Sequence, residues 1–398
     1  MSAPRLYLQD CGIVTPLGRG KADNAHALFA GSANGIVQSN DLIPNQGVYV
    51  GEVQGDFAAP PEGLHHLDSR NNRLMQVALT EIAPAVEKAA TRYGKNRIAV
   101  VLGTSTSGIS KSEDAMAVHQ NTGVWPDGYN YNQQEISSLS TFAAKFFSLT
   151  GPAYTVATAC SSSTKVFASA RRLIRAGLAD TAIVGGADTL CRMTLGGFGS
   201  LGLLSNEKCN PFSANRNGIN IGEGASAFLL SADEGPVEFM GIGEASDAHH
   251  PTAPDPDGGG ARKAMEQALN DAGLQPDDIA YINLHGTATQ LNDAMEARAV
   301  AAIFGPQTPC SSTKGITGHM LGATGGCEAA FMWLALNSAT NPDGLMPPHI
   351  WDGKRDTALP ALNFVKPDMR LPSNKPLAML SNSFGFGGSN AAIILGRL

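Results

Sequence analysis

Short apolar runs, many of them ending in glycine, alternate with longer segments of helical period along most of the chain. This alternation predicts buried strands connected by helices, the pattern of an α/β protein. In the first half the segments that predict strands are 6–14, 48–53, 98–102, 181–184, 225–230 and the run that begins at Thr155. The segments that predict helices there are 24–30, 74–90 with a kink at Pro84, 137–149 and 166–174.

Two long segments of the first half show neither the pattern of a strand nor that of a helix. Residues 104–134 are rich in Ser, Gly, Asn and Tyr and predict an irregular excursion. Residues 196–224 are rich in Gly and Ser and predict a loop.

The second half returns to the same order of elements, which is the signature of an internal repeat. Its predicted strands are 237–241, 279–284, 309–312, 379–383 and 391–395, and its predicted helices are 261–272 and a segment after His319. The strand that ends at His285 corresponds to the one that ends at Gly103, and the strand that leads to His319 corresponds to the one that leads to Cys160. We therefore expect two α/β halves, residues 1–234 and 235–398, with parallel-type sheets packed together and helices between and outside them. Two ordinary α/β segments without a common pattern remain the alternative.

Composition narrows the classes of function. The chain has 398 residues and a formal net charge of −7, so nothing in it indicates binding to nucleic acid or to an anionic membrane. Its six cysteines form no CxxC pair, which favours neither a zinc site nor a disulfide framework. We find no signal peptide and no apolar run long enough to span a membrane, and we expect a cytoplasmic protein.

A β-branched run meets a cysteine and several small hydroxyl residues at Thr155-Val156-Ala157-Thr158-Ala159-Cys160-Ser161-Ser162-Ser163-Thr164-Lys165. The pattern predicts a strand, a tight turn and a helix, with Cys160 near the helix N-terminus. The helix dipole would lower the pKa of the thiol there and strengthen it as a nucleophile. A buried structural cysteine is an equally open interpretation.

Three further motifs lie where strands meet glycine-rich turns, the usual place for ligand chemistry in α/β sheets. They are His285-Gly286-Thr287-Ala288-Thr289, the segment from Lys314 through Gly318-His319 to Gly326, and Asn382-Ser383-Phe384-Gly385-Phe386-Gly387-Gly388-Ser389-Asn390. Their spacing matches no metal site, no GxSxG serine elbow and no phosphate-binding loop.

With these motifs in order, the chain resembles nearly end to end the β-ketoacyl-[acyl-carrier-protein] synthases, elongating condensing enzymes of the thiolase superfamily. The resemblance implies a duplicated, five-layered αβαβα fold and an acyltransferase that joins a malonyl thioester to an enzyme-bound acyl chain with loss of CO₂. It also implies an acyl carrier protein as partner, and a homodimer or a heterodimer with a chain-length partner. No cofactor is expected, because phosphopantetheine arrives on the carrier.

The resemblance also implies roles in the chemistry. Cys160 would take the acyl group as a thioester. His285 and His319 would bind the malonyl thioester carbonyl and stabilise the enolate that forms as CO₂ leaves. Lys314 would hold the charge network around His319, together with Glu296.

Other residues would bind or orient the substrate. Phe384 would supply the second N–H of the oxyanion hole, beside that of Cys160, and its ring would be the gate next to the cysteine. Thr287 and Thr289 would hydrogen-bond the phosphopantetheine arm. Gly385 would let the backbone approach the thioester, and Ile109 would line the acyl tunnel.

Several alternatives stay open to different degrees. A coenzyme A-dependent thiolase carries a second cysteine in its C-terminal motif, which residues 382–390 lack. An initiating synthase would carry Asn in place of His319, and a non-catalytic chain-length partner subunit would lack Cys160. A cysteine hydrolase would not need two histidines and a lysine. Fatty-acid synthesis and a dedicated polyene or polyketide pathway are not separated, and the departures from the common pattern lean toward the latter.

Docking of the acidic carrier needs a basic patch on a chain whose net charge is negative. Arg70, Arg73 and Lys208 are the candidates, although they are equally interpreted as solvated surface charges. The loop at Cys209-Asn210-Pro211-Phe212 lacks the arginine that the resemblance leads us to expect there.

Overall fold

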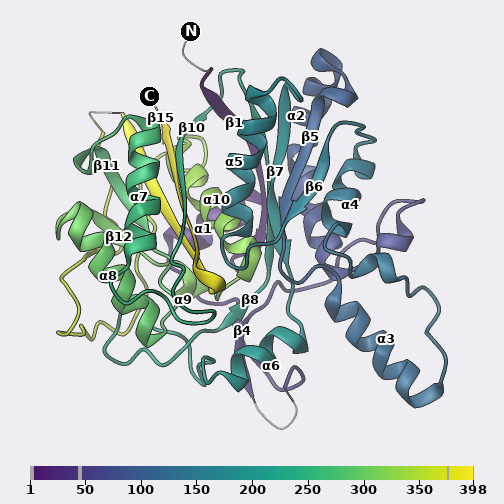
Figure 1. Ribbon diagram of the computed structural model, residues 1–398, viewed down its shortest axis with the longest axis horizontal. Coiled ribbons are helices and arrows are strands. Elements are labelled where there is room, and N and C mark those ends of the chain that lie inside the picture. The colour runs from purple at the N-terminus through teal and green to yellow at the C-terminus, as the bar shows by residue number, and fades with distance from the viewer. Residues whose placement is uncertain (1–3, 44–46, 374–375, 398) are drawn as a thin grey trace.

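The computed structural model describes residues 4–43, 47–373 and 376–397. Its helices are α1 (Gly20–Phe29), α2 (Arg70–Tyr93), α3 (Ile109–Thr122), α4 (Ser138–Phe146), α5 (Ser162–Arg175), α6 (Arg192–Ser200), α7 (Gly259–Ala272), α8 (Gln290–Phe304), α9 (Lys314–Thr317) and α10 (Thr324–Leu336) (Figure 1). The strands of the first half are β1 (Leu6–Thr15), β2 (Gly18–Arg19), β3 (Ile36–Ser39), β4 (Val48–Gly51), β5 (Ile98–Gly103), β6 (Ala153–Val156), β7 (Thr181–Asp188), β8 (Ile221–Gly222) and β9 (Gly224–Ser231). Those of the second half are β10 (Val237–Ser246), β11 (Ile279–Asn283), β12 (Pro309–Ser311), β13 (Asn363–Phe364), β14 (Leu377–Gly385) and β15 (Ser389–Arg397).

The two halves have the same sheet topology. Strand order is β6-β5-β7-β9-β1 in the first half and β12-β11-β14-β15-β10 in the second. In each, the first three strands of this order are parallel and the remaining pairings are antiparallel. The predicted repeat is confirmed, whereas the expectation of parallel-type sheets was wrong for half of the pairings. A short antiparallel contact of Leu6–Leu8 in β1 with β10 joins the two sheets along one edge.

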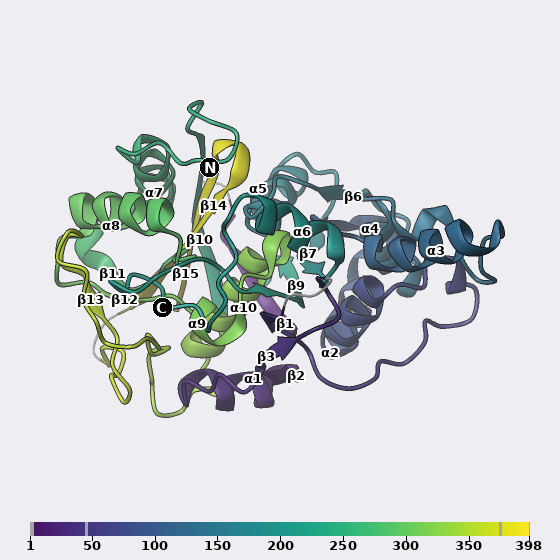
Figure 2. The same cartoon turned by 90° about the horizontal axis from the view of Figure 1, so that it is seen from below.

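Helices cover and separate the sheets in five layers. Figures 1 and 2 show α5 and α10 between the two groups of strands, with α2 and α4 on one outer side and α7 and α8 on the other. A continuous apolar cluster contains residues of α5, α10 and both sheets, while separate clusters fill the two outer interfaces. The predicted αβαβα arrangement is confirmed.

Period-two alternation explains how both faces of each sheet are buried. In β5, Ala99 and Val101 point to the central cluster, and the residues between and beside them point to the outer one. In β14, Leu377 and Met379 belong to the central cluster, and Leu380 belongs to the outer cluster of the second half. Because both faces carry apolar side chains, each strand is a continuous apolar run in the sequence, which is the pattern that predicted buried strands.

Two helices lie where the sequence predicted irregular structure. Within residues 104–134 the structure forms α3, of which only Ser112 and Ala115 are buried, so it has almost no apolar stripe to detect. Within residues 196–224 it forms the end of α6, whose three glycines weaken the helical signal. No helix among the described residues is long and apolar enough to cross a membrane.

A glycine at equivalent places in the two halves lets an outer helix press against a strand. A Cβ atom at Gly12 of β1 would lie 1.9 Å from the carbonyl oxygen of Ala78 in α2, and one at Gly243 of β10 would lie 1.9 Å from that of Ala264 in α7. Backbone oxygens of a packed helix cannot move aside cheaply, so both strands need glycine there.

We predict that Gly12→Ala and Gly243→Ala each destabilise the protein by about 1–3 kcal/mol, because the added methyl overpacks the strand–helix contact. Thermal or denaturant unfolding measures the change. Gly197→Ala in α6 is the matched control, since its Cβ would meet no atom within 4 Å. Equal midpoints for all three variants would contradict this account of the packing.

Candidate active site

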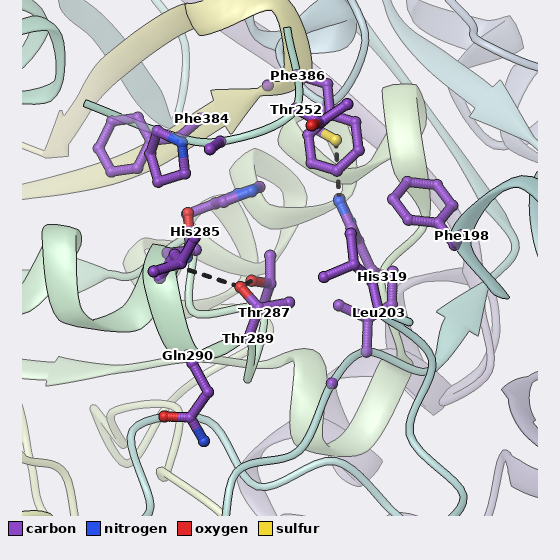
Figure 3. A pocket seen from close by; sticks show the side chains of 18 of the residues that line it. Phe198, Leu203, Thr252, His285, Thr287, Thr289, Gln290, His319, Phe384 and Phe386 are labelled. Atoms are coloured by element: carbon purple, nitrogen blue, oxygen red, sulfur yellow. Dashed lines mark hydrogen bonds between the residues drawn. The ribbon is translucent and has the colours of Figure 1, made fainter. Parts of the chain in front are cut away.

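The repeat brings the strand-to-helix turns of the two halves together. Cys160 lies in the turn between β6 and α5, and His285 follows β11. His319 lies between α9 and α10, Phe384 lies at the end of β14, and Phe386 lies in the turn that follows it. The three motif residues that the sequence singled out for chemistry, one thiol and two imidazoles, therefore meet in one buried place (Figure 3).

The turn that carries the thiol is strained and tightly bonded. Ala159 has a left-handed backbone, with φ of 52°, which is uncommon for a residue with a side chain. The hydroxyls of Ser161 and Ser162 donate to the carbonyl oxygens of Thr158 and Ala159, at 2.8 and 2.6 Å. The predicted tight turn is confirmed, and it holds Cys160 directly before the first turn of α5.

The side chains of Cys160, His285 and His319 lie close together. Cys160 Sγ lies 3.0 Å from His319 Nε2, and His319 Nδ1 lies 3.0 Å from Thr324 Oγ1. The rings of His285 and His319 are perpendicular, with centroids 5.3 Å apart, and the ring of Phe384 lies 5.8 Å from that of His285. A thiol can thus be acylated within reach of two hydrogen-bonding imidazoles.

A pocket opens onto these groups and is mainly apolar in its lining. It has a volume of about 200 Å³ and is lined by Cys160, His285, His319, Phe198, Leu203, Thr252, Thr287, Thr289, Gln290, Phe384, Gly385 and Phe386, among others. The hydroxyls of Thr287 and Thr289 lie 3.1 Å apart in it, as Figure 3 shows. Of the predicted binding residues, Ile109 does not line this pocket; it is the first residue of α3.

The charge network differs from the expected one. Lys314 Nζ donates to Glu328 Oε1 at 2.6 Å, and each side chain is only 1% exposed. Among the described residues the ion-pair partner of Lys314 is therefore Glu328 and not Glu296. The expected role of Lys314 in the charge network around His319 stays a prediction. The Glu296 carboxylate instead accepts the backbone N–H groups of His285 and Gly286, each at 2.7 Å, and so holds the His285 turn in shape.

The backbone N–H that reaches the thiol is also different from the expected one. Phe386, not Phe384, donates its N–H toward Cys160, together with the N–H of Cys160 itself. Phe384 is still within β14, opposite Asn390 of β15, whereas Phe386 belongs to the turn that follows. The ring of Phe386 packs at 5.3 Å against Phe198 of α6, and both Phe384 and Phe386 line the pocket. The ring of Phe384 as the gate stays a prediction.

Burial dominates the electrostatics of the site. It raises the pKa of the Cys160 thiol to about 11, against the lowering effects of the Lys314 charge and the Phe386 N–H. The expectation of a lowered thiol pKa was therefore wrong, because desolvation of a thiolate outweighs the turn's favourable dipoles. Burial, and then the nearby Lys314 charge, lowers the pKa of His285 and of His319 well below the ordinary value. All three groups are neutral at neutral pH.

One buried carboxylate that the sequence did not indicate holds the two halves together at the site. Asp188, at the end of β7, accepts from the hydroxyl of Thr104 at 2.7 Å and from that of Thr106 at 2.7 Å. It also accepts the backbone N–H of Ala323, just before α10, at 3.0 Å. An aspartate after an apolar strand was the available signal, but its partners lie in loops far apart in the sequence.

The candidate docking residues are engaged within the chain. The Arg70 guanidinium makes a bidentate contact with the fully buried Glu223 and donates to the carbonyl of Val53 at 2.8 Å. Arg73 pairs with Asp68 at 2.6 Å. Arg70 and Arg73 thus each have an acidic partner within the chain, and Lys208 is exposed. Docking of the carrier on these three residues stays a prediction.

The donor set could also hold a soft metal ion. The ligand atoms of Cys160, His285 and His319 all lie within 4.8 Å of one another, a spacing that Zn²⁺ could bridge after small shifts. The expectation that the site works without a metal stays a prediction.

Comparisons with known proteins agree with this geometry. The model "Beta-ketoacyl synthase, N-terminal domain" matches residues 12–234, and "Beta-ketoacyl synthase, C-terminal domain" matches residues 237–346. The "3-oxoacyl-[acyl-carrier-protein] synthase 2" of Coxiella burnetii is 31% identical over the full length of both chains. A chain of the structure "Ketosynthase (ApeO) in Complex with its Chain Length Factor (ApeC) from Xenorhabdus doucetiae" is 42% identical, with a TM-score of 0.92 over 100% of both chains. A chain of "The ishigamide ketosynthase/chain length factor" is 25% identical, with a TM-score of 0.87 and the same coverage.

We predict that the reactivity of Cys160 follows its raised pKa. The rate of alkylation by iodoacetamide should rise about tenfold per pH unit from about pH 7 to about pH 10, because only the thiolate reacts. Lys314→Met should slow alkylation at any pH in this range, since it removes the charge that favours the thiolate and leaves Glu328 unpaired. Mass spectrometry of the labelled peptide, with Cys160→Ala to assign it, gives the rate. A plateau near the ordinary thiol pKa of about 8.5 would contradict the prediction.

Proposed function

The chain belongs to the β-ketoacyl synthase family, and from this premise we propose how its own residues divide the family's reaction among them. The protein is an acyltransferase that elongates an acyl chain by condensation in fatty-acid or polyketide synthesis. The observation that carries the assignment of residues is the contact of Cys160 Sγ with His319 in a pocket that also holds His285.

The first half-reaction loads the thiol. Cys160 Sγ attacks the carbonyl carbon of an acyl thioester on the carrier's phosphopantetheine arm. The oxygen that becomes negative accepts from the N–H groups of Cys160 and Phe386, the pair directed at this sulfur. The C–S bond to the arm then breaks, its sulfur leaves with the proton that Cys160 loses, and the acyl group stays on Cys160. No cofactor is needed beyond the arm that the carrier brings.

The second half-reaction makes the carbon–carbon bond. A malonyl thioester loses CO₂, and the electron pair of the broken bond forms an enolate without a strong base. His285 and His319 donate hydrogen bonds to the enolate oxygen. Neutral imidazoles suit this role, because each can keep its proton while it binds the developing charge. The enolate carbon attacks the acyl carbonyl carbon, Cys160 leaves as thiolate, and it takes up a proton from solvent to restore the thiol.

Lys314 adds to the effect of burial in keeping both imidazoles neutral, and it does not line the pocket. Its ammonium lies near both rings and lowers the pKa of each, while Glu328 compensates its own charge. We propose that Thr287, Thr289 and Gly385 line the path of the phosphopantetheine arm, which their place in the pocket supports. Ile109 would line the acyl tunnel in the assembled dimer.

We propose an acyl carrier protein and a second ketosynthase-type chain as partners. Strand β6 ends one sheet, and Tyr154 within it is 37% exposed, so its edge can accept another strand. The second chain can be a copy of this one or a chain-length partner, since both structural relatives are ketosynthases with a chain length factor. Because identity is 42% to that ketosynthase complex and 31% to the fatty-acid type synthase, we propose a dedicated polyene or polyketide pathway. Fatty-acid synthesis is the second candidate.

Two further proposals concern the chain as a whole. It divides into halves at residues 234 and 235, which the shared strand order of the two sheets supports. It acts in the cytoplasm, where its six unpaired cysteines would remain reduced. Thiolase activity with coenzyme A and a non-catalytic partner role are the alternatives, and the presence of Cys160 beside two histidines speaks against the second.

We predict that Cys160→Ala abolishes transfer of an acyl group from acyl-carrier protein to the enzyme and, with it, condensation. Intact-protein mass spectrometry after mixing should find no adduct. Cys191→Ala is the matched control, because that thiol is buried but lies outside the pocket, and its adduct should equal that of the parent protein. An adduct that persists on Cys160→Ala would remove this residue from its role.

We predict that substitution of either histidine impairs decarboxylation and not acylation of Cys160. His285→Ala and His319→Ala should still accept an acyl group on Cys160, but release of CO₂ from malonyl-carrier protein should fall by roughly a hundredfold or more, as for loss of an oxyanion donor. Labelled CO₂ measures decarboxylation, and mass spectrometry measures acylation of the same samples. Decarboxylation at the parent rate in either variant would show that its imidazole does not hold the enolate.

A further inference from the structure

A hydroxyl group behind His319 has no role in the reaction described above. Thr324 is the first residue of α10, and its Oγ1 lies 3.0 Å from His319 Nδ1. The opposite nitrogen of the same ring, Nε2, faces the thiol of Cys160 at 3.0 Å. The imidazole is therefore held between a hydroxyl at its back and the nucleophile at its front.

Both sides of this contact are rigid. The backbone N–H of His319 donates to the Asn220 carbonyl at 2.7 Å, and its own carbonyl accepts the N–H of Gly222 at 2.8 Å. Thr324 is followed by Gly325, where a Cβ atom would lie 1.9 Å from Thr164 Oγ1 of α5, so the first turn of α10 is pressed against α5. Neither ring nor hydroxyl can move away without disturbing the central layer.

In the part of the chain that the structure describes, the hydroxyl of Thr324 has one acceptor to which it can donate its proton. Thr324 is fully buried, and among the described residues its Oγ1 has a single hydrogen-bond partner, His319 Nδ1. A buried O–H that fails to donate is costly. The hydroxyl therefore donates to Nδ1, which must then be the unprotonated nitrogen, and the proton of the neutral ring is on Nε2.

His285 provides the contrast within the same pocket. Its Nδ1 is buried and has no hydrogen-bond partner among the described residues. Its ring is oriented by packing against His319 and Phe384 instead. Of the two imidazoles, only that of His319 has a side chain that selects its tautomer.

We infer that Thr324 is a positioning residue that fixes His319 as an Nε2–H donor toward the enolate oxygen. The inference rests on the proposed function, because it concerns the donor that holds the enolate oxygen. With the proton fixed on Nε2, the ring is ready to donate before malonyl thioester arrives, so no tautomer exchange precedes decarboxylation. The loading of Cys160 needs no such donor from His319, since Cys160 and Phe386 supply the N–H groups for that step.

The two half-reactions should therefore respond differently to the loss of this hydroxyl. Thr324→Val keeps the β-branched shape and removes only the O–H, and Thr324→Ser keeps the O–H and removes a methyl. In Thr324→Val we expect kcat for CO₂ release from malonyl-carrier protein to fall roughly tenfold or more, with KM nearly unchanged. Acylation of Cys160 should keep at least its parent rate, because an Nε2 without a proton can accept that of the thiol. Thr324→Ser should restore decarboxylation to within about threefold of the parent.

The outcomes separate the inference from its alternatives. Parent-like decarboxylation in Thr324→Val would overturn it, and so would equal losses of acylation and decarboxylation in both variants, which indicate a packing role. If the parent protein acylates and condenses while Thr324→Val is unaffected, only the inference fails. If the parent protein shows no condensation, the proposed function fails first.

A measurement on the parent protein tests the tautomer directly and does not depend on how a variant folds. In protein labelled with ¹⁵N-histidine, the ring signals of His319, assigned by their loss in His319→Gln, should show a protonated Nε2 and an unprotonated Nδ1 at neutral pH. The opposite pattern, with the proton on Nδ1, would overturn the inference.

Discussion

A buried ammonium beside two imidazoles is the constraint on which the site depends. Lys314 is withdrawn from water together with Glu328, and burying such a pair is tolerable only when its geometry is good, as the 2.6 Å contact indicates. The pair anchors α9 to α10 across the turn that carries His319. Its positive end also opposes protonation of His285 and His319, and so adds to the larger effect of burial, which lowers the pKa of both imidazoles.

The duplicated fold places a functional side chain on the equivalent strand-to-helix turn of each half. In the first half the turn after the third strand of the α/β pattern presents a thiol, and in the second half the equivalent turn presents His319. Because α5 and α10 lie face to face between the sheets, these turns meet (Figure 2). Asp188 then connects the loop after β5 in the first half to the start of α10 in the second half.

The pocket keeps its reacting groups neutral and surrounds them with oriented dipoles. Burial makes the thiolate of Cys160 and the imidazolium forms of both histidines costly, so charge appears only as the reaction proceeds. Donors that already point to the places where charge develops need no reorganisation at that moment, which is the physical basis of their catalytic effect. In the proposed mechanism the N–H of Phe386 serves the thioester oxygen in this way, and the imidazole N–H groups serve the enolate.

The sequence predicted most of the strands, the repeat and the strand-end motifs that contain Cys160, His285 and His319, since these depend on local period and on local motifs. It did not predict α3, α8 or the end of α6. What the sequence left undecided depends on contacts between distant segments. Strand length decided that the N–H at the thiol is that of Phe386 and not of Phe384, because β14 extends through Gly385 before it turns. Packing decided that Lys314 pairs with Glu328 and that Ile109 is outside the pocket. Desolvation, which arises only when the layers close over the site, decided that the thiol pKa is raised.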